Sequence, residues 1–455
     1  MRIAVIGSGV AGLGAAWLLS GQHEVVLYER ERRFGGHSDT RETTIDGRPV
    51  AVDTGFIVYN EPNYPNLTAL LAHLGVATDW SDMSFGVSLD GGRYEYGSGW
   101  LSFLGQRSNI ASPVHWRLLR EITRFNREAP ALLARAEDGT LSLGRYLQER
   151  GFCAPFTDRY LLPMAAAIWS ASMRDMLDYP ARTFVRFLAN HGLLRVAGQL
   201  RWRTVRGGSR NYVAHLIEPL RAGARLGSGA TRIERGRAGV RVRDTAGQWD
   251  SFDRVIVATH GDQALALLGD ASPRERQVLG AFRYTANSAV LHRDPRLMPR
   301  RRRVWSSWNY VGGAGAIEAP ASLTYWMNRL QNLGAAPDIF VSLNPTRSPA
   351  PELTMAEMHY EHPLFDRAAL EAQRALPALQ GEGGVFFCGS YMGYGFHEDA
   401  LSAGLAVAER LGARRPWRLP EPQRPPLASA PHLPDLGDLV PLPTPAPVAV
   451  RVTRK

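Results

Sequence analysis

The start of the chain combines a strand, a glycine-rich turn and a helix in an order that few folds accommodate. Residues 2–6 form an apolar run typical of a buried strand, and residues 11–19 predict a helix. Between these two segments the glycines follow the spacing G-x-G-x-x-G, at Gly7, Gly9 and Gly12. In this pattern the first glycine permits a tight turn and the second lets the backbone approach a pyrophosphate. The third lets the helix pack against the strand.

The helix after the turn directs its positive end at the bound diphosphate, with Val10 and Ala11 at its start. A second apolar run, residues 24–28, predicts another strand and ends at Glu29, 22 residues after Gly7. An acid at this position accepts hydrogen bonds from an adenosine ribose, and Arg30 lies beside it. Strand, turn, helix, strand and acid in register predict a Rossmann-like dinucleotide site.

A second glycine pair indicates which dinucleotide is bound. Gly35 and Gly36 follow the second strand and precede His37. Bare glycines let the chain pass over a pyrophosphate that is already seated. The pair resembles the second phosphate motif of flavoproteins in the amine oxidase and phytoene desaturase superfamily, which implies FAD rather than NAD. His37 stands where many of those enzymes carry a basic residue, and a plain turn remains the alternative.

The C-terminal part of the sequence resembles the flavin-binding end of the same superfamily. Residues 385–390 predict a strand that ends at glycine, and residues 398–408 predict a helix. In the superfamily this helix directs unpaired amides at the flavin N1 and C2 carbonyl, where they stabilise negative charge. Cys388 does not match the usual position of a covalent flavin link, so we expect noncovalent FAD. The resemblance implies cofactor contacts at Thr54, Gly55, Phe56, Ile233, Gly389, Ser390, Phe396, His397 and Ala400.

Four longer segments narrow the resemblance. They are DTGFIVYNEPNYPNL at 53–67, LLPMAAAIWS at 161–170, FLANHGLL at 187–194 and GYGFHEDALSAGL at 393–405. They resemble a bacterial subgroup of FAD-dependent, amine-oxidase-like oxidoreductases associated with cyclopropane-fatty-acid synthase-like methyltransferases. The resemblance covers residues 1 to about 412. It implies a phospholipid acyl chain as substrate, a lipid methyltransferase as candidate partner, and desaturation of methylated chains on the way to furan fatty acids.

Desaturation of an acyl chain needs hydride transfer to flavin N5 and one group that accepts a proton. Dioxygen would then reoxidise the flavin and leave as hydrogen peroxide. The candidate proton acceptors are His397, Glu398, Tyr394 and Tyr59. The alternatives stay open: His397 and Glu398 cap the helix or bind the flavin, and the tyrosines form an aromatic wall. His191 fits a satisfied buried histidine better than a catalyst, and no metal-ligating constellation appears.

Composition excludes several classes of protein. The net charge is +10, and Lys455 is the only lysine among 53 basic residues. Many flavin amine oxidases keep a lysine bonded through water to flavin N5, so this shortage counts against an ordinary amine oxidase. Cys153 and Cys388 are the only cysteines, which excludes a disulfide framework. A basic surface favours anionic partners, and lipid is preferred because no nucleic-acid-binding motif is visible.

The motifs predict an α/β fold, a two-dinucleotide-binding-domain flavoprotein with a mixed helical and sheet substrate domain. The FAD-binding domain is expected at 1–60, 204–265 and 380–413, and the substrate or cap domain at 61–203 and 266–379. A Pro-rich tail at 416–455 should be extended or disordered. No apolar stretch of about 18 residues and no signal peptide are present, so we expect a cytoplasmic protein. Peripheral attachment to the inner face of the cytoplasmic membrane is a further expectation.

One predicted helix suggests how a membrane surface is reached. In residues 113–128 the apolar positions Val114, Leu118, Ile122 and Phe125 should face inward, while the arginines at 117, 120, 124 and 127 share another face. Aromatic residues precede this helix, and residues 300–303 form a run of four arginines. A basic face beside aromatics suits an anionic membrane, and a plain solvated face is the alternative.

Two other functions stay open at this point. The first is oxidation of a small amine or desaturation of a polyene. The second is a non-catalytic, flavin-bound partner of a lipid methyltransferase. An NAD-dependent dehydrogenase is disfavoured because the second glycine pair and the C-terminal segment would then lack a role. A homodimer also remains open.

Overall fold

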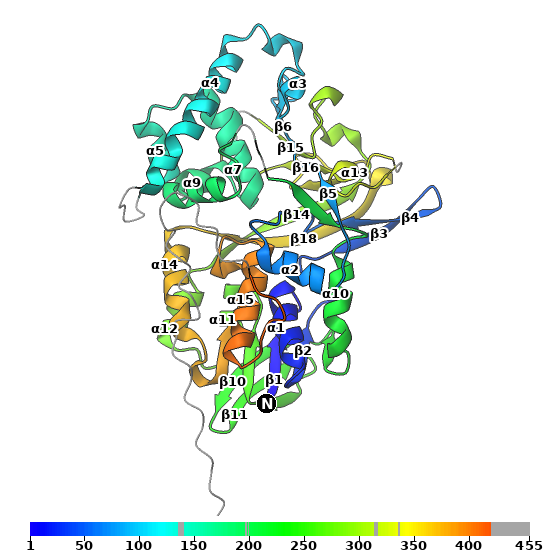
Figure 1. Cartoon of the computed structure of the whole chain (residues 1–455), viewed down its shortest axis with the longest axis vertical. Coiled ribbons are helices and arrows are strands. Elements are labelled where there is room, and N and C mark those ends of the chain that lie inside the picture. Colours follow the sequence, from blue (N-terminus) through cyan, green and yellow to red (C-terminus); the bar gives the residue numbers. More distant parts are fainter. Residues whose placement is uncertain (135–140, 196–197, 199, 314–316, 335–336, 420–455) are drawn as a thin grey trace, which may run out of the picture.

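The protein has two lobes, with the predicted cofactor domain below and the predicted cap above (Figure 1). The computed structural model describes residues 1–134, 141–195, 198, 200–313, 317–334 and 337–419. Among these residues, no helix has both the length and the apolar character needed to cross a bilayer.

The lower lobe is built on a five-stranded parallel sheet. Its strand order is β19-β13-β1-β2-β9. The strands are β1 (Arg2–Ile6), β2 (Glu24–Glu29), β9 (Ala224–Leu226), β13 (Arg254–Val257) and β19 (Val385–Phe387). Three of these strands are near-continuous apolar runs because a parallel sheet is covered on both faces. The observed order confirms the predicted α/β class.

Alternate strand residues enter two separate cores. Ile3, Val5 and Leu27 pack under the helices α1, α2, α10 and α15. Ala4, Ile6 and Val26 pack on the opposite face, under α11, α12, α14 and a three-stranded antiparallel sheet. The helices are α1 (Val10–Ser20), α2 (Pro65–His73), α10 (Arg210–Ile217), α11 (Gly261–Leu267), α12 (Pro273–Leu279), α14 (Arg367–Ala375) and α15 (His397–Arg410), and the small sheet is β10 (Ala230–Gly236), β11 (Gly239–Asp244) and β12 (Trp249–Phe252).

The packing in these two cores places the boundary between the lobes at residues other than those predicted from the sequence. The buried leucines of α2 and the buried alanines of α14 pack with the cofactor sheet, although both helices fall within the ranges predicted for the cap. The first residues of the predicted tail also dock here, since the Trp417 ring stacks on Trp17 with centroids 6.2 Å apart. Residues 420–455 of that tail lie outside the described residues.

The upper lobe contains a seven-stranded sheet in the order β18-β14-β17-β16-β15-β6-β7. Strands β16 and β17 come from the second insert, as we call residues 266–379 of the predicted cap, and the first insert is residues 61–203. The first insert adds β6 and β7, and β6 pairs parallel with β15. The strands are β6 (Phe85–Leu89), β7 (Tyr94–Gly97), β14 (Arg283–His292), β15 (Trp308–Gly312), β16 (Leu323–Trp326), β17 (Phe340–Leu343) and β18 (Thr354–Leu364).

Helices from the first insert cover one side of this sheet (Figure 1). They are α3 (Trp100–Phe103), α4 (Pro113–Glu128), α5 (Leu143–Glu149), α6 (Ala154–Phe156), α7 (Leu162–Trp169), α8 (Met173–Asp178) and α9 (Ala181–Asn190). Two further antiparallel ladders have two strands each: the hairpin of β3 (Thr40–Ile45) with β4 (Arg48–Asp53), and the long-range pair of β5 (Thr78–Ser81) with β8 (Trp202–Val205). A short helix, α13 (Met327–Leu330), follows β16.

The predicted helix at 113–128 is α4, but its faces differ from the prediction at two positions. Leu118 and Phe125 are buried as expected, whereas Val114 is 41% exposed. His115 takes the inward place, because its ring nitrogens bond the Tyr94 hydroxyl at 2.7 Å and the Phe103 carbonyl at 3.1 Å. Arg124 is not a free surface charge, since it pairs with the carboxylates of its own helix, Glu121 at 3.3 Å and Glu128 at 3.2 Å.

Helix packing in the lower lobe depends on one glycine. A methyl group at Gly404 of α15 would lie 2.1 Å from the Ala11 carbonyl oxygen of α1. The backbones of these two helices therefore touch, and any side chain at 404 forces them apart. Both helices begin at the edge of the parallel sheet where the predicted cofactor binds, so their spacing sets the shape of that site.

Replacing Gly404 with alanine should separate α1 from α15. We expect a loss of about 1–3 kcal/mol of unfolding free energy from overpacking, with weaker retention of FAD. Thermal midpoint and flavin content of the purified variant are the measurements. Gly21→Ala is the matched control because a methyl there meets nothing within 4 Å. Equal midpoints for the two variants would contradict the tight helix contact.

Candidate cofactor and active site

The first glycine turn leaves open space at the start of α1. Gly7 has a φ of +100°, and a methyl on Gly12 would lie 1.9 Å from the Gly7 carbonyl oxygen, so the turn packs tightly against the helix. Around Gly9 a methyl would meet nothing within 4 Å. No side chain caps this helix, so its first amides lack a side-chain acceptor. Open space beside bare amides is the cradle that a diphosphate requires.

Glu29 lies where the sequence placed it, buried at the end of β2. Its Oε2 atom accepts from the Ser8 amide at 2.9 Å and from the Ser8 hydroxyl at 2.5 Å, and its Oε1 accepts from the Glu31 amide at 2.8 Å. The Ser8 carbonyl in turn accepts from the Gly35 amide at 3.0 Å. The acid thus ties both glycine motifs together at the place where the adenosine ribose is expected.

The second glycine motif passes directly over the first. Gly35 and Gly36 have φ values of +116° and +57°, which favour glycine, and a methyl on Gly36 would lie 3.0 Å from the Gly9 Cα. Behind this crossing, the Phe56 amide donates to the His37 carbonyl at 2.7 Å. The predicted cofactor residues Thr54, Gly55 and Phe56 are therefore adjacent to the glycine pair.

His37 is half-buried beside the crossing, and its buried Nε2 atom lacks a partner. Its ring lies near three others, with centroid distances of 5.2 Å to Tyr360, 5.5 Å to His362 and 6.3 Å to His260. Burial, with the neighbouring histidines, lowers the pKa of His37 well below its usual range, so the ring is neutral. The Arg33 Nη1 atom is a second buried donor without a partner.

Two orphaned polar atoms beside an open glycine cradle fit a polar cofactor. The phosphate oxygens of a dinucleotide would accept from the Arg33 Nη1 and His37 Nε2 atoms, while Arg33 Nη2 is already paired with Asp39 at 3.1 Å. The residues present therefore fit FAD, with Gly9, Val10 and Ala11 at the phosphates and Glu29 at the ribose.

The start of α15 presents a neutral histidine at the other end of the site. The His397 Nε2 atom is 2.7 Å from the Tyr212 hydroxyl and 3.5 Å from the Ser38 hydroxyl, and its ring stacks on Phe56 at 3.8 Å. Burial lowers the pKa of His397 to about 3. Sequence reasoning missed Ser38 and Tyr212, which hold this ring, because they come from segments far apart in the chain.

Glu398 is used to cap a helix. Its carboxylate oxygens accept from the Asn66 and Leu67 amides at 2.9 Å each, at the start of α2. Asp399 likewise accepts from the Phe396 amide at 2.9 Å and caps α15 itself. Burial raises the pKa of each acid to about 7. Glu398 therefore acts as a helix cap, which was one of the alternatives, but it caps α2 and not α15, the helix that contains it.

The other predicted acceptors lie in different surroundings. The Tyr59 ring is buried against Tyr64 with centroids 6.1 Å apart, and its hydroxyl bonds to Thr78. Tyr394 packs near Phe187 of α9, with centroids 6.1 Å apart, and belongs to the aromatic wall that was its alternative. Of the four candidates, His397 begins α15 and Tyr394 lies in the turn before it, whereas the Glu398 carboxylate bonds the amides of α2.

An aromatic wall from the cap closes this end of the site. Phe187 is its centre, with ring centroids 3.9 Å from His191, 4.6 Å from Trp169 and 5.1 Å from Phe396. His191 is satisfied by the Phe187 carbonyl at 3.0 Å, and burial lowers its pKa to about 4, as expected for a structural histidine. The side chains of the wall are therefore aromatic and uncharged, with the buried Trp169 Nε1 atom as an unpartnered donor and the Arg186 charge close to Tyr394.

Two other residues predicted to contact the cofactor are Ser390, in the turn before α15, and Ala400, in α15 itself. The Ser390 carbonyl accepts from the Gly393 and Gly395 amides and forms the turn that follows Gly389. Ala400 is buried on the second turn of α15, 8% exposed.

Ile233 lies in β10, and Arg30 directly follows β2. Ile233 is fully buried, and its carbonyl accepts from the Gly269 amide at 2.9 Å. Arg30 is exposed and lies 3.6 Å from Glu31. Across the described residues, no group of three or more His, Cys, Asp or Glu side chains is arranged to hold a metal ion.

Comparisons with known proteins agree with this geometry. A family model described as flavin containing amine oxidoreductase matches residues 10–297, more than half of the chain. No curated relative matches the sequence. A putrescine oxidase bound to putrescine has the same fold, with 18% identity and a TM-score of 0.65 over 90% of this chain and 99% of that one.

Two further solved structures share the fold with the same two coverages. One is described as a CLA-producing fatty acid isomerase from P. acnes, with 16% identity and a TM-score of 0.63. The other is a cyclohexylamine oxidase from Brevibacterium oxydans, with 15% identity and a TM-score of 0.61. Identities this low show a common fold and leave the substrate open.

Replacing Gly9 with alanine should abolish FAD binding while the fold persists. The added methyl meets no protein atom within 4 Å, so it enters only the space that the diphosphate needs. We expect an unchanged apoprotein melting temperature and at least about tenfold weaker binding in an FAD titration. Gly12→Ala is the contrasting variant, since its methyl overlaps the Gly7 carbonyl and should disrupt folding itself. Full FAD affinity in Gly9→Ala would refute the assignment of the cradle.

Glu398 predicts a pH dependence of stability. Its pKa is about 7 in the folded chain against an ordinary 4.5, so the folded state holds a proton that the unfolded state releases between these values. Stability from this group therefore falls as pH rises, by on the order of 3 kcal/mol at most.

Glutamine at 398 mimics the protonated acid and removes this dependence. Wild type should melt above Glu398→Gln near about pH 5, because the glutamine NH2 group cannot accept from a backbone amide of α2 as the second carboxyl oxygen does, and wild type should lose stability relative to the variant by about pH 8. A wild type that gains stability relative to the variant over this range would show that the carboxylate is not strained by burial.

Proposed function

Since the chain belongs to the flavin containing amine oxidoreductase family, we propose that this FAD-dependent oxidoreductase desaturates the acyl chain of a membrane phospholipid. The proposed substrate is an unsaturated or methylated chain, in which a double bond next to the reacting carbon spreads the developing charge. The family and the cofactor are established by the match, whereas the substrate is the proposal.

The uncharged aromatic wall is the observation that supports this substrate most strongly. Phe187 and Phe396 are nearly parallel, with centroids 5.1 Å apart and planes 17° apart. Two rings that sandwich a substrate need about 7 Å, twice a van der Waals contact of about 3.5 Å. These rings therefore pack on each other and do not form an amine-holding cage between them. A flat apolar wall suits an acyl chain.

The carboxyl groups nearest the wall are also unsuited to hold a cation. Glu398 and Asp399 are committed to helix caps, and their raised pKa values keep them largely protonated below about pH 7. No lysine occurs between residues 1 and 454. Both features distinguish this site from the amine oxidases that use a water-bonded lysine.

The proposed reaction removes a hydride from one carbon and a proton from its neighbour, which leaves a new carbon–carbon double bond. FAD, when bound, supplies the hydride acceptor, and dioxygen is the proposed final oxidant, leaving as hydrogen peroxide. His397 is the candidate proton acceptor because its neutral ring begins α15, the helix expected to face the flavin, although the burial that lowers its pKa to about 3 also makes it a weak base. Tyr212 and Ser38 would orient that ring, and the aromatic wall would exclude water.

Oxidation of a small amine is the second candidate. The aromatic residues near α15 favour it, since aromatic faces attract cations. Among the fold relatives, two are described as amine oxidases and one as a fatty acid isomerase, so either substrate class has a precedent on this fold.

Anaerobic mixing with defined substrates separates these functions. We expect methylated unsaturated phospholipids in detergent micelles to bleach the visible flavin absorbance, and saturated phospholipids of equal length to leave it unchanged. His397→Gln should retain FAD and slow bleaching by about tenfold or more, within the range usual for loss of a proton acceptor. Bleaching by putrescine or cyclohexylamine but by no lipid would overturn the proposal in favour of an amine oxidase.

A flavin that no member of either panel reduces would instead indicate a non-catalytic role. The candidate partner in that case is a lipid methyltransferase, and its recovery with the FAD-loaded protein from cell extract would support that reading.

A further inference from the structure

We propose that the tip of the cap lobe docks on an anionic lipid bilayer, through an exposed apolar patch joined to an arginine-lined recess. The inference deepens the proposed function, because it states how a membrane acyl chain is reached. It rests on three features of the described residues: exposure, unpaired charge and continuity with the core of the cap.

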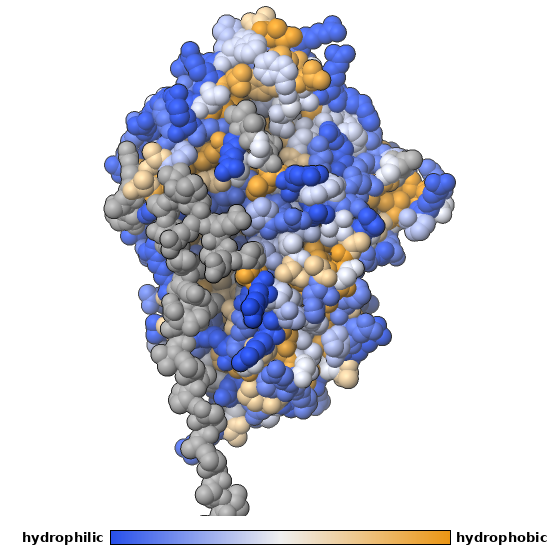
Figure 2. All heavy atoms as spheres, viewed as in Figure 1, coloured by the Kyte–Doolittle hydropathy of each residue, from blue (hydrophilic) through white to orange (hydrophobic). Residues whose placement is uncertain are grey.

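The tip carries a concentrated apolar surface. Five of the ten large exposed hydrophobic residues in the described chain fall within residues 100–116. Figure 2 shows apolar residues gathered at the upper end of the molecule, where Figure 1 places α3 and the start of α4. We call this surface the tip patch; it consists of Trp100 (64% exposed), Leu101 (87%), Ile110 (52%), Val114 (41%) and Trp116 (40%).

The tip patch is held by a defined scaffold. The Trp116 indole nitrogen donates to the Ile110 carbonyl at 2.8 Å, which fixes the ring beside its neighbour. Phe103, the last residue of α3, is buried, with its ring 4.1 Å from the ring of His115. Large side chains that remain exposed on an anchored scaffold are characteristic of an interaction surface.

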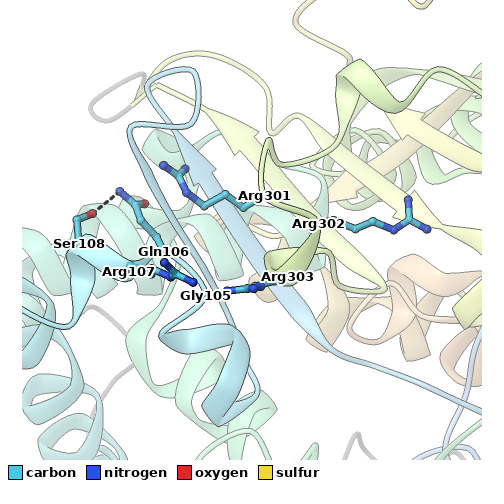
Figure 3. A pocket seen from close by; sticks show the side chains of 7 residues that line it. All are labelled: Gly105, Gln106, Arg107, Ser108, Arg301, Arg302 and Arg303. Carbon is cyan, nitrogen blue, oxygen red and sulfur yellow. Dashed lines mark hydrogen bonds between the residues drawn. The ribbon is translucent and has the colours of Figure 1, made fainter.

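A recess of about 570 Å³ opens next to the patch (Figure 3). One wall continues directly from α3 and the other comes from the four-arginine run. The two walls touch, since a methyl on Gly105 would lie 3.0 Å from the Val304 side chain. The lining residues are Gly105, Gln106, Arg107, Ser108, Arg301, Arg302 and Arg303.

The arginines of the recess divide into paired and unpaired groups. Arg301 bonds the buried Glu95 carboxylate at 2.8 Å, and Arg302 bonds Asp338 at 2.9 Å, so both are held by protein acids. Within the described ranges, Arg107 and Arg303 form no side-chain hydrogen bond or ion pair. Figure 3 shows them reaching the recess from its two opposite walls.

The surrounding sequence leaves this positive charge uncompensated. Residues 96–120 contain three arginines and no aspartate or glutamate. Free guanidinium groups bind phosphate oxygens well, and neighbouring tryptophans suit the boundary between headgroups and acyl chains. This pairing of charge and apolar surface is complementary to anionic phospholipid rather than to a purely polar ligand.

The tip patch and the active site share one hydrophobic core. Phe103 and Leu118, which anchor the tip, belong to the same buried cluster as Trp169 and Phe187 of the aromatic wall. A bilayer bound at the tip would therefore lie at the outer end of the lobe that covers the proposed cofactor. This arrangement suits an enzyme whose substrate enters from the membrane.

Vesicle co-sedimentation of the FAD-loaded protein tests the docking surface. Wild type should bind vesicles that contain phosphatidylglycerol, bind phosphatidylcholine vesicles more weakly, and lose binding at high salt. The double variants Trp100→Ser/Leu101→Ser and Arg107→Ser/Arg303→Ser should each bind anionic vesicles with an affinity at least about tenfold lower than that of wild type. Flavin content should stay unchanged, because none of these side chains is part of the cofactor site.

Two control variants each carry a single change of the same kind elsewhere. Leu226→Ser removes an exposed apolar residue, 46% exposed, from the lower lobe, and Arg237→Ser removes an exposed arginine from the turn between β10 and β11. Both should bind like wild type. Equal binding by tip variants and controls, or no binding of wild type to anionic vesicles, would overturn the proposal. So would loss of a dimer in the tip variants with unchanged vesicle binding, since a second copy would then occupy the patch.

The outcome is separable from that of the proposed function. Vesicle binding without flavin reduction by micellar lipid would support the docking surface and refute acyl desaturation. Flavin reduction by micellar lipid without vesicle binding would support desaturation and refute the docking surface.

Discussion

The contact between two glycine motifs is the constraint on which the rest of the lower lobe depends. Gly36 crosses Gly9 so closely that a methyl would lie 3.0 Å from the Gly9 Cα, and Glu29 holds both motifs through Ser8. The crossing leaves bare amides and open space at the start of α1. It also fixes His37, and through the His37 carbonyl the segment that carries Phe56. Both ends of the predicted cofactor site are thus positioned by one backbone contact.

The buried titratable groups of this site share one property: burial favours the uncharged form of each. His37, His191 and His397 have lowered pKa values and are neutral, while Glu398 and Asp399 have raised ones. The site therefore offers polar atoms where a cofactor needs them and little fixed charge elsewhere. Such an interior tolerates an apolar substrate, and the strong positive charge of the chain is left for the surface. The unpaired arginines at the tip fit this division.

Local patterns predicted the elements that carry the cofactor, because the turn, its helix and the acid of β2 are close together in the sequence. Contacts between distant segments were not predictable in this way. Tyr212 meets His397, and His362 meets His37, only after the chain returns to the sheet. Glu398 shows the same effect, since its partners on α2 are more than three hundred residues away. Val114 was misplaced because its polar neighbour His115 takes the inward place on the first turn of α4, bonded to Tyr94 and Phe103.

The central claim is that the opening turn binds the adenosine diphosphate half of FAD, and a comparison of two flavins tests it most directly. Apoprotein should be titrated with FAD and with FMN, which lacks the adenylate, while flavin fluorescence is followed. The account predicts tight, noncovalent binding of FAD, with FMN weaker by about tenfold or more. A protein that stays colourless in excess FAD, or that binds both flavins equally, would contradict it.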